Sequence, residues 1–357
     1  MRRFAVIALS AALVLLGACT QTIPDDAYVV GFYNVENLFD TVHDRGKNDQ
    51  AFTPGGENAW TEDKYEKKLS NIATVIRAMS EKNGRWHTLL GMAEVENDHV
   101  LEDLVAREEI AGAGYKFVHV ESPDVRGIDC ALLYRPDQFK LLDTKTLPYD
   151  FNTKRGIVFE KTPQEQREFK TRDVLCVRGK LDGEDFIIYV AHYPSRTGDK
   201  GSDLRCRASE ILYADLREQE RLHPGIKVVV MGDMNDNPAD ESLAVWLHGR
   251  ETIEEMGEGD LFSPFFRMHK DGFGTEEYRG EWNIFDCIFV NGALAKPAEG
   301  ALGIRKSDAT HYGYVFNPPF LVQQEGRYAG TPFRTFSGGQ FISGYSDHYP
   351  TYIIISK

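Results

Sequence analysis

Cysteine is scarce in this sequence, basic residues are outnumbered, and long hydrophobic runs are missing beyond the N-terminus. Its 357 residues contain only five cysteines, which excludes a small fold held together by disulfides. There is no CxxC pair and no Cys/His spacing typical of a metal site. Lysine and arginine total 41 against 55 acidic residues, giving a net charge of -14. This charge argues against a generic duplex-binding module, which would need a basic face, but not against an enzyme that uses a local site and bound cations.

The N-terminus has the pattern of an export signal. Arg2 and Arg3 precede an apolar run over residues 4–16, which at about 13 residues is short of the ~20 needed to span a membrane. The segment LGAC at 16–19 resembles the bacterial lipobox, in which the chain is cut before a cysteine that then receives lipid. We therefore expect a signal peptide at 1–18, lipidation of Cys19, a polar tether at 19–27, and an exported protein anchored in a bacterial cell envelope. A plain secretory signal is the alternative.

The remaining chain, 28–357, has the pattern of one α/β domain. Apolar runs predict strands at 28–34, 88–94, 115–120, 129–135, 173–179, 186–193, 226–233, 284–290 and 351–356. Helices are predicted from Thr61 onward, over 98–110 and over 202–222, the last with Leu204, Ala208, Ile211, Leu212 and Leu216 facing inward. Long loops at 41–60, 145–170, 257–283 and 303–340 are candidates for substrate contacts.

Four cysteines remain once Cys19 is assigned to the anchor. Two disulfides are possible in an oxidising compartment, but three of the four lie in apolar strand-like runs, so buried free thiols are the favoured interpretation. These cysteines are Cys130, Cys176, Cys206 and Cys287.

Acidic, amide and imidazole side chains recur at the ends of the predicted strands. Each alone would be explained by a turn or a salt bridge. Strand ends can bring them together, however, so the set is more informative than its members. The set comprises Asn34, Glu94, Asp233, Asn235, Asp347 and His348.

The segments FYNVEN, GMAEVEN, VAHYPSR, GDMNDNP, FDCIFV and GYSDHYP occur in this order along the chain. Together they resemble the endonuclease/exonuclease/phosphatase superfamily. The resemblance implies a four-layer α/β sandwich, in which two mixed β-sheets pack face to face with flanking helices, and a site at one edge of the sandwich.

The resemblance also assigns roles to residues. Glu94, Asn34 and Asp347 match the family's cation site, and oxygen ligands of this kind suit Mg²⁺, for which Mn²⁺ can substitute. Asp233 and Asn235 match the pair opposite the metal.

His348 matches a histidine that contacts phosphate or acts as base, and the sequence leaves open whether it or Asp233 is the general base. Asp286 matches the aspartate that orients His348, and His192 matches a second histidine on the phosphate or leaving-group side.

Candidate phosphate-binding groups follow His192, namely Arg196, Arg205 and Arg207. The resulting hypothesis is a divalent-metal-dependent phosphodiesterase, acting as a monomer, with DNA or RNA as substrate. The alternatives are a phosphatase or phosphodiesterase on small or lipid-linked phosphates, such as inositol phosphates or sphingomyelin, and a non-catalytic protein that binds phosphate-rich ligands. No protein partner is indicated.

Overall fold

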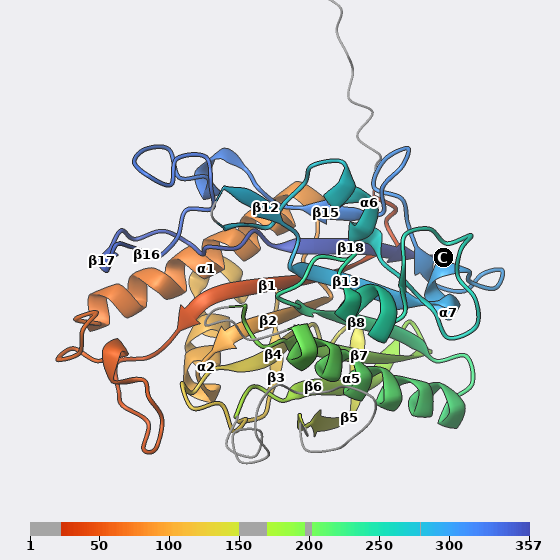
Figure 1. Cartoon of the computed structure of the whole chain (residues 1–357), viewed down its shortest axis with the longest axis horizontal. Helices are drawn as coiled ribbons and strands as arrows, with labels where there is room; N and C mark the ends of the chain where they lie inside the picture. Colours follow the sequence, from red (N-terminus) through yellow and green to blue (C-terminus); the bar gives the residue numbers. More distant parts are fainter. Residues whose placement is uncertain (1–22, 150–169, 197–201, 279) are drawn as a thin grey trace, which may run out of the picture.

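The fold is built around two seven-stranded mixed β-sheets, seen in a computed structural model that describes residues 23–149, 170–196, 202–278 and 280–357 (Figure 1). The first sheet runs in the order β14 (Gly303–Ile304), β18 (Thr351–Ser356), β1 (Tyr28–Leu38), β2 (Leu89–Val95), β4 (Asp129–Tyr134) and β3 (Lys116–His119), with β15 (Gly313–Val315) also on β18. The second runs β5 (Phe139–Leu147), β6 (Val174–Leu181), β7 (Glu184–His192), β8 (Lys227–Asp233), β13 (Asp286–Asn291), β10 (Leu261–Phe262) and β9 (Gly249–Arg250).

Helices cover the outer faces of the two sheets. The helices are α1 (Glu62–Asn83), α2 (Asp98–Ala106), α3 (Glu108–Ala111), α5 (Ser202–Leu222), α6 (Pro264–Lys270) and α7 (Gly292–Ala295), with short turns η1 (Gln50–Phe52), η2 (Ser242–Trp246) and η3 (Pro319–Leu321). Two hairpins, β11 (Glu276–Tyr278) with β12 (Glu281–Asn283) and β16 (Phe336–Ser337) with β17 (Gln340–Phe341), lie in the loops. Figure 1 shows α1 in orange and α5 in green on opposite sides of the strands.

Alternation along β1 explains the layers. Val30 and Phe32 belong to the core cluster shared with the second sheet, whereas Val29 and Tyr33 belong to the cluster that contains the apolar stripe of α1. Because successive residues of a strand face opposite sides, both faces of this sheet are covered, which is why residues 28–33 of β1 are all hydrophobic or glycine. The expected four-layer α/β sandwich is confirmed.

All nine predicted strands are present, and the differences lie elsewhere. Strand β5 was not predicted, because most of its residues are exposed or half-buried and a bulge interrupts its alternation. The helix predicted over 98–110 is broken at Arg107, whose extended ψ of 134° separates α2 from α3.

The predicted start of the first helix is confirmed: Thr61 occupies the N-cap position of α1, although its side chain makes no capping bond. Ile211, predicted to face inward on α5, is only half-buried. The cysteines Cys130, Cys176, Cys206 and Cys287 are buried free thiols. The predicted signal peptide and Cys19 lie outside the described residues, as does most of the loop predicted at 145–170.

Candidate active site

Strand register brings three of the predicted residues side by side at one edge of the second sheet. His192 ends β7 and pairs with Asp233 at the end of the parallel strand β8. Asp286 begins β13 and pairs with the same Asp233 from the other side. Gly232 permits this arrangement, because a Cβ at that position would lie 2.1 Å from the carbonyl oxygen of Ala191.

The first sheet contributes to the same edge. Asn34 of β1 donates a 3.0 Å hydrogen bond from Nδ2 to Oδ2 of Asp233, so the two sheets are joined at the site by buried side chains. Ser346 fixes the segment before β18 to β1: its hydroxyl donates to the Asn34 carbonyl at 2.7 Å and accepts from the His348 N–H at 3.1 Å. The packing of the sheets therefore assembles the site.

Asp233 and Asn235 are locked into a tight turn. The Asn235 backbone N–H donates to Oδ1 of Asp233 at 2.9 Å, and its side-chain amide donates to the Tyr193 carbonyl at 3.1 Å. Asn235 has a φ of 49°, in the left-handed region that most side chains avoid. Such conformations persist where surrounding structure enforces them, as these bonds do here.

One carboxylate oxygen of Glu94 accepts a backbone hydrogen bond, and the other faces the site. Its Oε2 accepts from the Asn37 N–H at 2.9 Å, and its Oε1 lies 3.9 Å from Nε2 of His192. Glu94 also has a positive φ, 65°, directly before the end of β2. The backbone strain and the free oxygen together mark Glu94 as a functional position.

His348 and Asp286 form a buried pair. Nδ1 of His348 lies 2.7 Å from Oδ2 of Asp286, which is completely buried. Nε2 faces the site, 3.9 Å from both Asp233 Oδ2 and Asp347 Oδ1. Although burial alone lowers the pKa of His348, the Asp286 carboxylate and then Asp233 raise it well above the usual histidine value.

Burial also shifts the pKa of the groups facing His348. It raises the pKa of Asp233 to about 6, with His348 opposing the shift and Asp286 adding to it. Burial lowers the pKa of His192 well below its usual value, and the nearby Arg172 and Arg126 lower it further. His348 is thus a cation beside an aspartate whose pKa is about 6, while His192 is a neutral imidazole.

Two of the three predicted phosphate-binding arginines hold the loop after Asn235, and the third forms an ion pair within α5. Arg196 donates to the Asn235 carbonyl at 2.8 Å and to Asp236 at 2.7 Å. Arg205 lies 2.8 Å from Asp236, and Arg207 pairs with Glu210. Their role toward substrate stays a prediction.

Polar residues that sequence reasoning overlooked also lie at the site. Glu276 has its pKa raised to about 7, first by burial and then by Asp347, against the opposing effect of His348. Arg334 lies 3.7 Å from Asp347. Both come from loops without strand periodicity, but the long loops at 257–283 and 303–340 were the regions expected to hold substrate contacts.

The flanking acidic residues near Glu94 have structural partners. Glu36 accepts from the Thr335 N–H at 2.6 Å, Glu96 accepts from the Asp40 N–H at 2.7 Å, and Asn97 caps α2 by accepting from the Val100 N–H at 3.1 Å. These contacts hold the loops that surround the site.

Comparison with known proteins agrees with this geometry. The sequence profile described as "Endonuclease/Exonuclease/phosphatase family" matches residues 29–357. The chain belongs to the endonuclease/exonuclease/phosphatase family. Members of this family are generally metal-dependent phosphoester hydrolases. No curated protein sequence matches the chain.

Solved structures share the fold of this family member at low sequence identity. Zebrafish (D. rerio) TDP2 complexed with single-strand DNA product has a TM-score of 0.55 at 14% identity, covering 93% of this chain and 100% of that one. A mannosyl-6-phosphatase of Bacteroides thetaiotaomicron has a TM-score of 0.53 at 16% identity, covering 92% and 100%. The human Nocturnin catalytic domain with bound sulfate has a TM-score of 0.54 at 16% identity, covering 93% of each.

The donor set of this family member fits a hard divalent cation. Glu94, Asn34 and Asp347 offer only oxygen ligands, and Mg²⁺ is commonly held by one or two carboxylates while it keeps several waters. Two further groups of potential metal ligands in the described residues, His119 with Glu121 and Asp129, and Asp44 with Asp49 and Glu96, contain none of these three ligands. Their carboxylates also accept hydrogen bonds from neighbouring residues.

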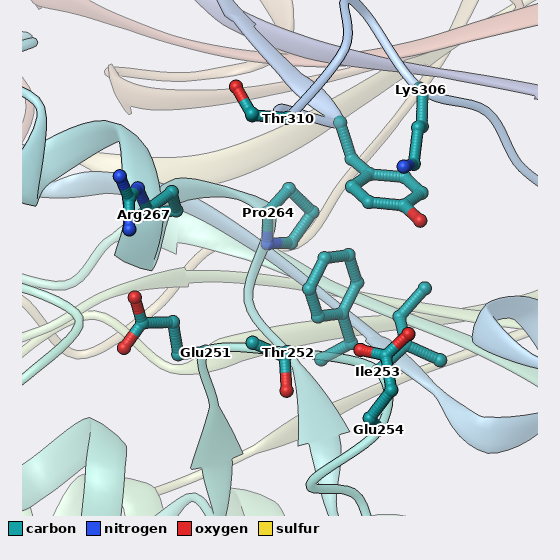
Figure 2. Close-up of a pocket in the computed structure, with 10 residues that line it drawn as sticks. Glu251, Thr252, Ile253, Glu254, Pro264, Arg267, Lys306 and Thr310 are labelled. Carbon is teal, nitrogen blue, oxygen red and sulfur yellow. The ribbon is translucent and has the colours of Figure 1, made fainter.

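A cavity of about 320 Å³ lies apart from the predicted site residues, none of which lines it. Figure 2 shows Arg267 and Lys306 at opposite ends of this cavity, with Pro264 between them. Arg267 pairs with Asp271 at 2.9 Å, and the Lys306 ammonium lies over the Tyr312 ring, so both basic groups of the cavity already have protein partners.

Proposed function

We propose that the protein is an exported, metal-dependent phosphodiesterase that hydrolyses DNA or RNA. The observation that carries the proposal is the joint placement of the His348–Asp286 pair and Asp233, with Glu94 and Asn34 opposite them. Hydrolysis of a phosphodiester needs charge neutralisation at the phosphoryl oxygens, a positioned water and a proton acceptor, and this edge of the sandwich offers groups for each.

Each side chain has a distinct part in the reaction. Asp233 accepts the proton of the attacking water, because its pKa of about 6 leaves it ionised at neutral pH yet basic enough to take a proton. His348 is held protonated by Asp286, so it donates from Nε2 to a phosphoryl oxygen and is unsuited to be the base. Asn235 is positioned for a second donor contact.

The cation site completes the set. A divalent cation held by Glu94, Asn34 and Asp347 would neutralise the charge that develops on the phosphoryl group. His192 is neutral and lies 3.5 Å from Asp233. It orients the phosphate or the leaving oxygen without adding charge.

An aromatic surface next to His348 supports a polynucleotide substrate. Trp282 is 39% exposed and stacks on Tyr349, the residue after His348, with ring centroids 6.0 Å apart and planes at 14°. A base can stack on such a face for about 1–3 kcal/mol. Inositol phosphates and sphingomyelin have no base to place there, so this surface favours the nuclease over the alternatives.

The export and the anchor rest on the sequence. Cys19 follows a short apolar run and precedes a polar tether, which together indicate attachment to a bacterial membrane by acyl chains. Within residues 23–149, 170–196, 202–278 and 280–357, no helix is long and apolar enough to cross a membrane.

A substrate panel tests the proposed activity. The purified full chain in detergent is incubated with supercoiled plasmid, single-stranded RNA, inositol phosphates and sphingomyelin, with Mg²⁺ or with EDTA. We expect Mg²⁺-dependent cleavage of DNA or RNA that EDTA abolishes. Free phosphate from monoesters with intact polynucleotides would instead establish a phosphatase, and no turnover of any substrate would leave a phosphate-binding protein.

A further inference from the structure

Arg334 lies beside Asp347 at the candidate active site, and among the described residues no other carboxylate forms an ion pair with it. Its Nη2 lies 3.7 Å from Oδ2 of Asp347, and the two side chains are 24% and 28% exposed. Its guanidinium stacks over the ring of Tyr328, with Cζ 4.9 Å from the ring centroid. Stacking on Tyr328 therefore orients the Arg334 guanidinium beside Asp347, a predicted metal ligand.

The hydrogen-bonding capacity of Arg334 is unused. A guanidinium carries five N–H donors, and arginine–carboxylate pairs normally close to about 2.7–2.9 Å. Arg196, for comparison, reaches Asp236 at 2.7 Å. Within the described residues the Arg334 side chain donates no hydrogen bond, and its Nε is buried without a partner. Holding Asp347 is thus a poor explanation for its placement.

The backbone beside Arg334 is anchored from inside the protein. The buried ammonium of Lys68 donates to the Thr335 hydroxyl at 2.6 Å, and the Thr335 N–H donates to Glu36 at 2.6 Å. Gly344 packs so closely that a Cβ there would lie 2.1 Å from the Arg334 carbonyl oxygen. A loop held this firmly presents the arginine in a preorganised position, as a binding site for a substrate requires.

We propose that Arg334 binds a second phosphate of the substrate, adjoining the one that is cleaved. Asp347 lies between the two positions, with His348 Nε2 3.9 Å from its Oδ1 and Arg334 3.7 Å from its Oδ2. The Asp347 carboxylate thus separates Arg334 from the position of the phosphoryl group that His348 would contact. Its planar fork matches phosphate oxygens. This inference rests on the proposed function. It narrows the substrate to a polynucleotide chain, or a nucleotide terminus, in which a second phosphate neighbours the one that is cleaved.

Dinucleotides test the proposal through turnover. Thymidylyl-thymidine is compared with its 5′-phosphorylated and 3′-phosphorylated forms, which separate the two possible sources of the second phosphate. We expect the wild type to prefer one phosphorylated form by about ten- to hundredfold in kcat/KM, the effect of a charged hydrogen-bonded contact. Arg334→Gln should remove that preference and leave the unphosphorylated dinucleotide and the Mg²⁺ activation curve unchanged.

Arg327→Gln is the matched control. Arg327 stacks on the same Tyr328 ring, at 5.6 Å, but it is exposed, and within the described part of the chain it forms no ion pair with Asp347. Its loss should therefore leave the preference intact. An equal kcat/KM for all three dinucleotides in the wild type would overturn the proposal. A rise in the Mg²⁺ requirement of Arg334→Gln without loss of preference would also overturn it, because it would show that Arg334 only positions Asp347.

A binding measurement separates this proposal from the proposed function. Calorimetry with Mg²⁺ compares inorganic pyrophosphate with orthophosphate, and Arg334→Gln should weaken pyrophosphate binding about tenfold while sparing orthophosphate. That result, with no dinucleotide hydrolysed by the wild type, would refute the nuclease and keep the role of Arg334. Equal weakening of both ligands would refute the role of Arg334 alone.

Discussion

Replacing Asp286 by asparagine preserves the shape of the His348 pair and removes its charge. Asp286 is completely buried, and its Oδ2 lies 2.7 Å from Nδ1 of His348. Burial alone lowers the pKa of this histidine, so its protonated form depends on the carboxylate. In Asp286→Asn the imidazole should therefore be neutral at pH 7, and its contact with the phosphoryl oxygen should lose its positive charge.

The expected loss of kcat can be estimated from what a single hydrogen-bond donor to a phosphoryl oxygen contributes to the rate. Removing one preorganised donor to a developing oxyanion costs about 10²–10³ in rate, which corresponds to about 3–4 kcal/mol. We expect kcat to fall by about that factor on bis(p-nitrophenyl) phosphate with saturating Mg²⁺. KM should change little, because the contact strengthens mainly in the transition state.

Asp308→Asn provides the matched control. Asp308 holds His311 through an Nδ1 contact of the same 2.7 Å, in a loop that contains none of the predicted site residues. Its replacement should leave kcat unchanged, and thermal melting should show that both variants are folded. A folded Asp286→Asn enzyme with wild-type kcat would refute the reasoning, since it would reduce Asp286 to a strand residue.

Three further predictions address the metal, the anchor and stability. Glu94→Gln should lose most activity and need more Mg²⁺ to regain it, and an undiminished rate at low Mg²⁺ would contradict the metal assignment. Cys19→Ser should abolish palmitate labelling in cells, whereas absence of label in the wild type would indicate a plain secretory signal. His87 is fully buried, which lowers its pKa to about 3. Its contribution to stability is therefore complete above the unfolded pKa of about 6.5 and is lost as pH falls toward 3. Between pH 7 and 5, urea titrations should show the free energy of unfolding of the wild type falling by about 2 kcal/mol relative to that of His87→Leu. Equal falls in the two proteins would contradict this prediction.

Much of the core could be predicted because most of the longer strands are buried on both faces. The apolar run of β8, for instance, has no polar residue between Lys227 and Asp233. Strand β5 could not be found this way, since solvent covers residues such as Lys140 and Asp143 and a bulge shifts its register. The break in the helix at Arg107 could not be predicted, because the helical sequence pattern continues on both sides of it.

The site was predictable to the extent that its residues end strands. His192, Asp233 and Asp286 share one register row, so their proximity follows once the strand order is known. Arg334 reaches the site from a loop, and Glu276 from the three-residue strand β11, which is too short to show an alternating pattern. Their positions depend on tertiary contacts that a single sequence does not encode in any local pattern.

Lys68 shows how such contacts change the meaning of a residue. It lies on α1 beside the apolar stripe, where a lysine normally faces solvent, yet it is 1% exposed. Burial lowers its pKa to about 8 and raises that of Glu36 to about 7, and each charge opposes the shift of the other. Burying either ion alone would be costly, and the pair is tolerated because Thr335 and the Tyr345 carbonyl also bond to it. The pair thus fixes the loop that ends in Asp347 and His348 to the first sheet, so the geometry of the metal and phosphate contacts depends on a helix that touches neither.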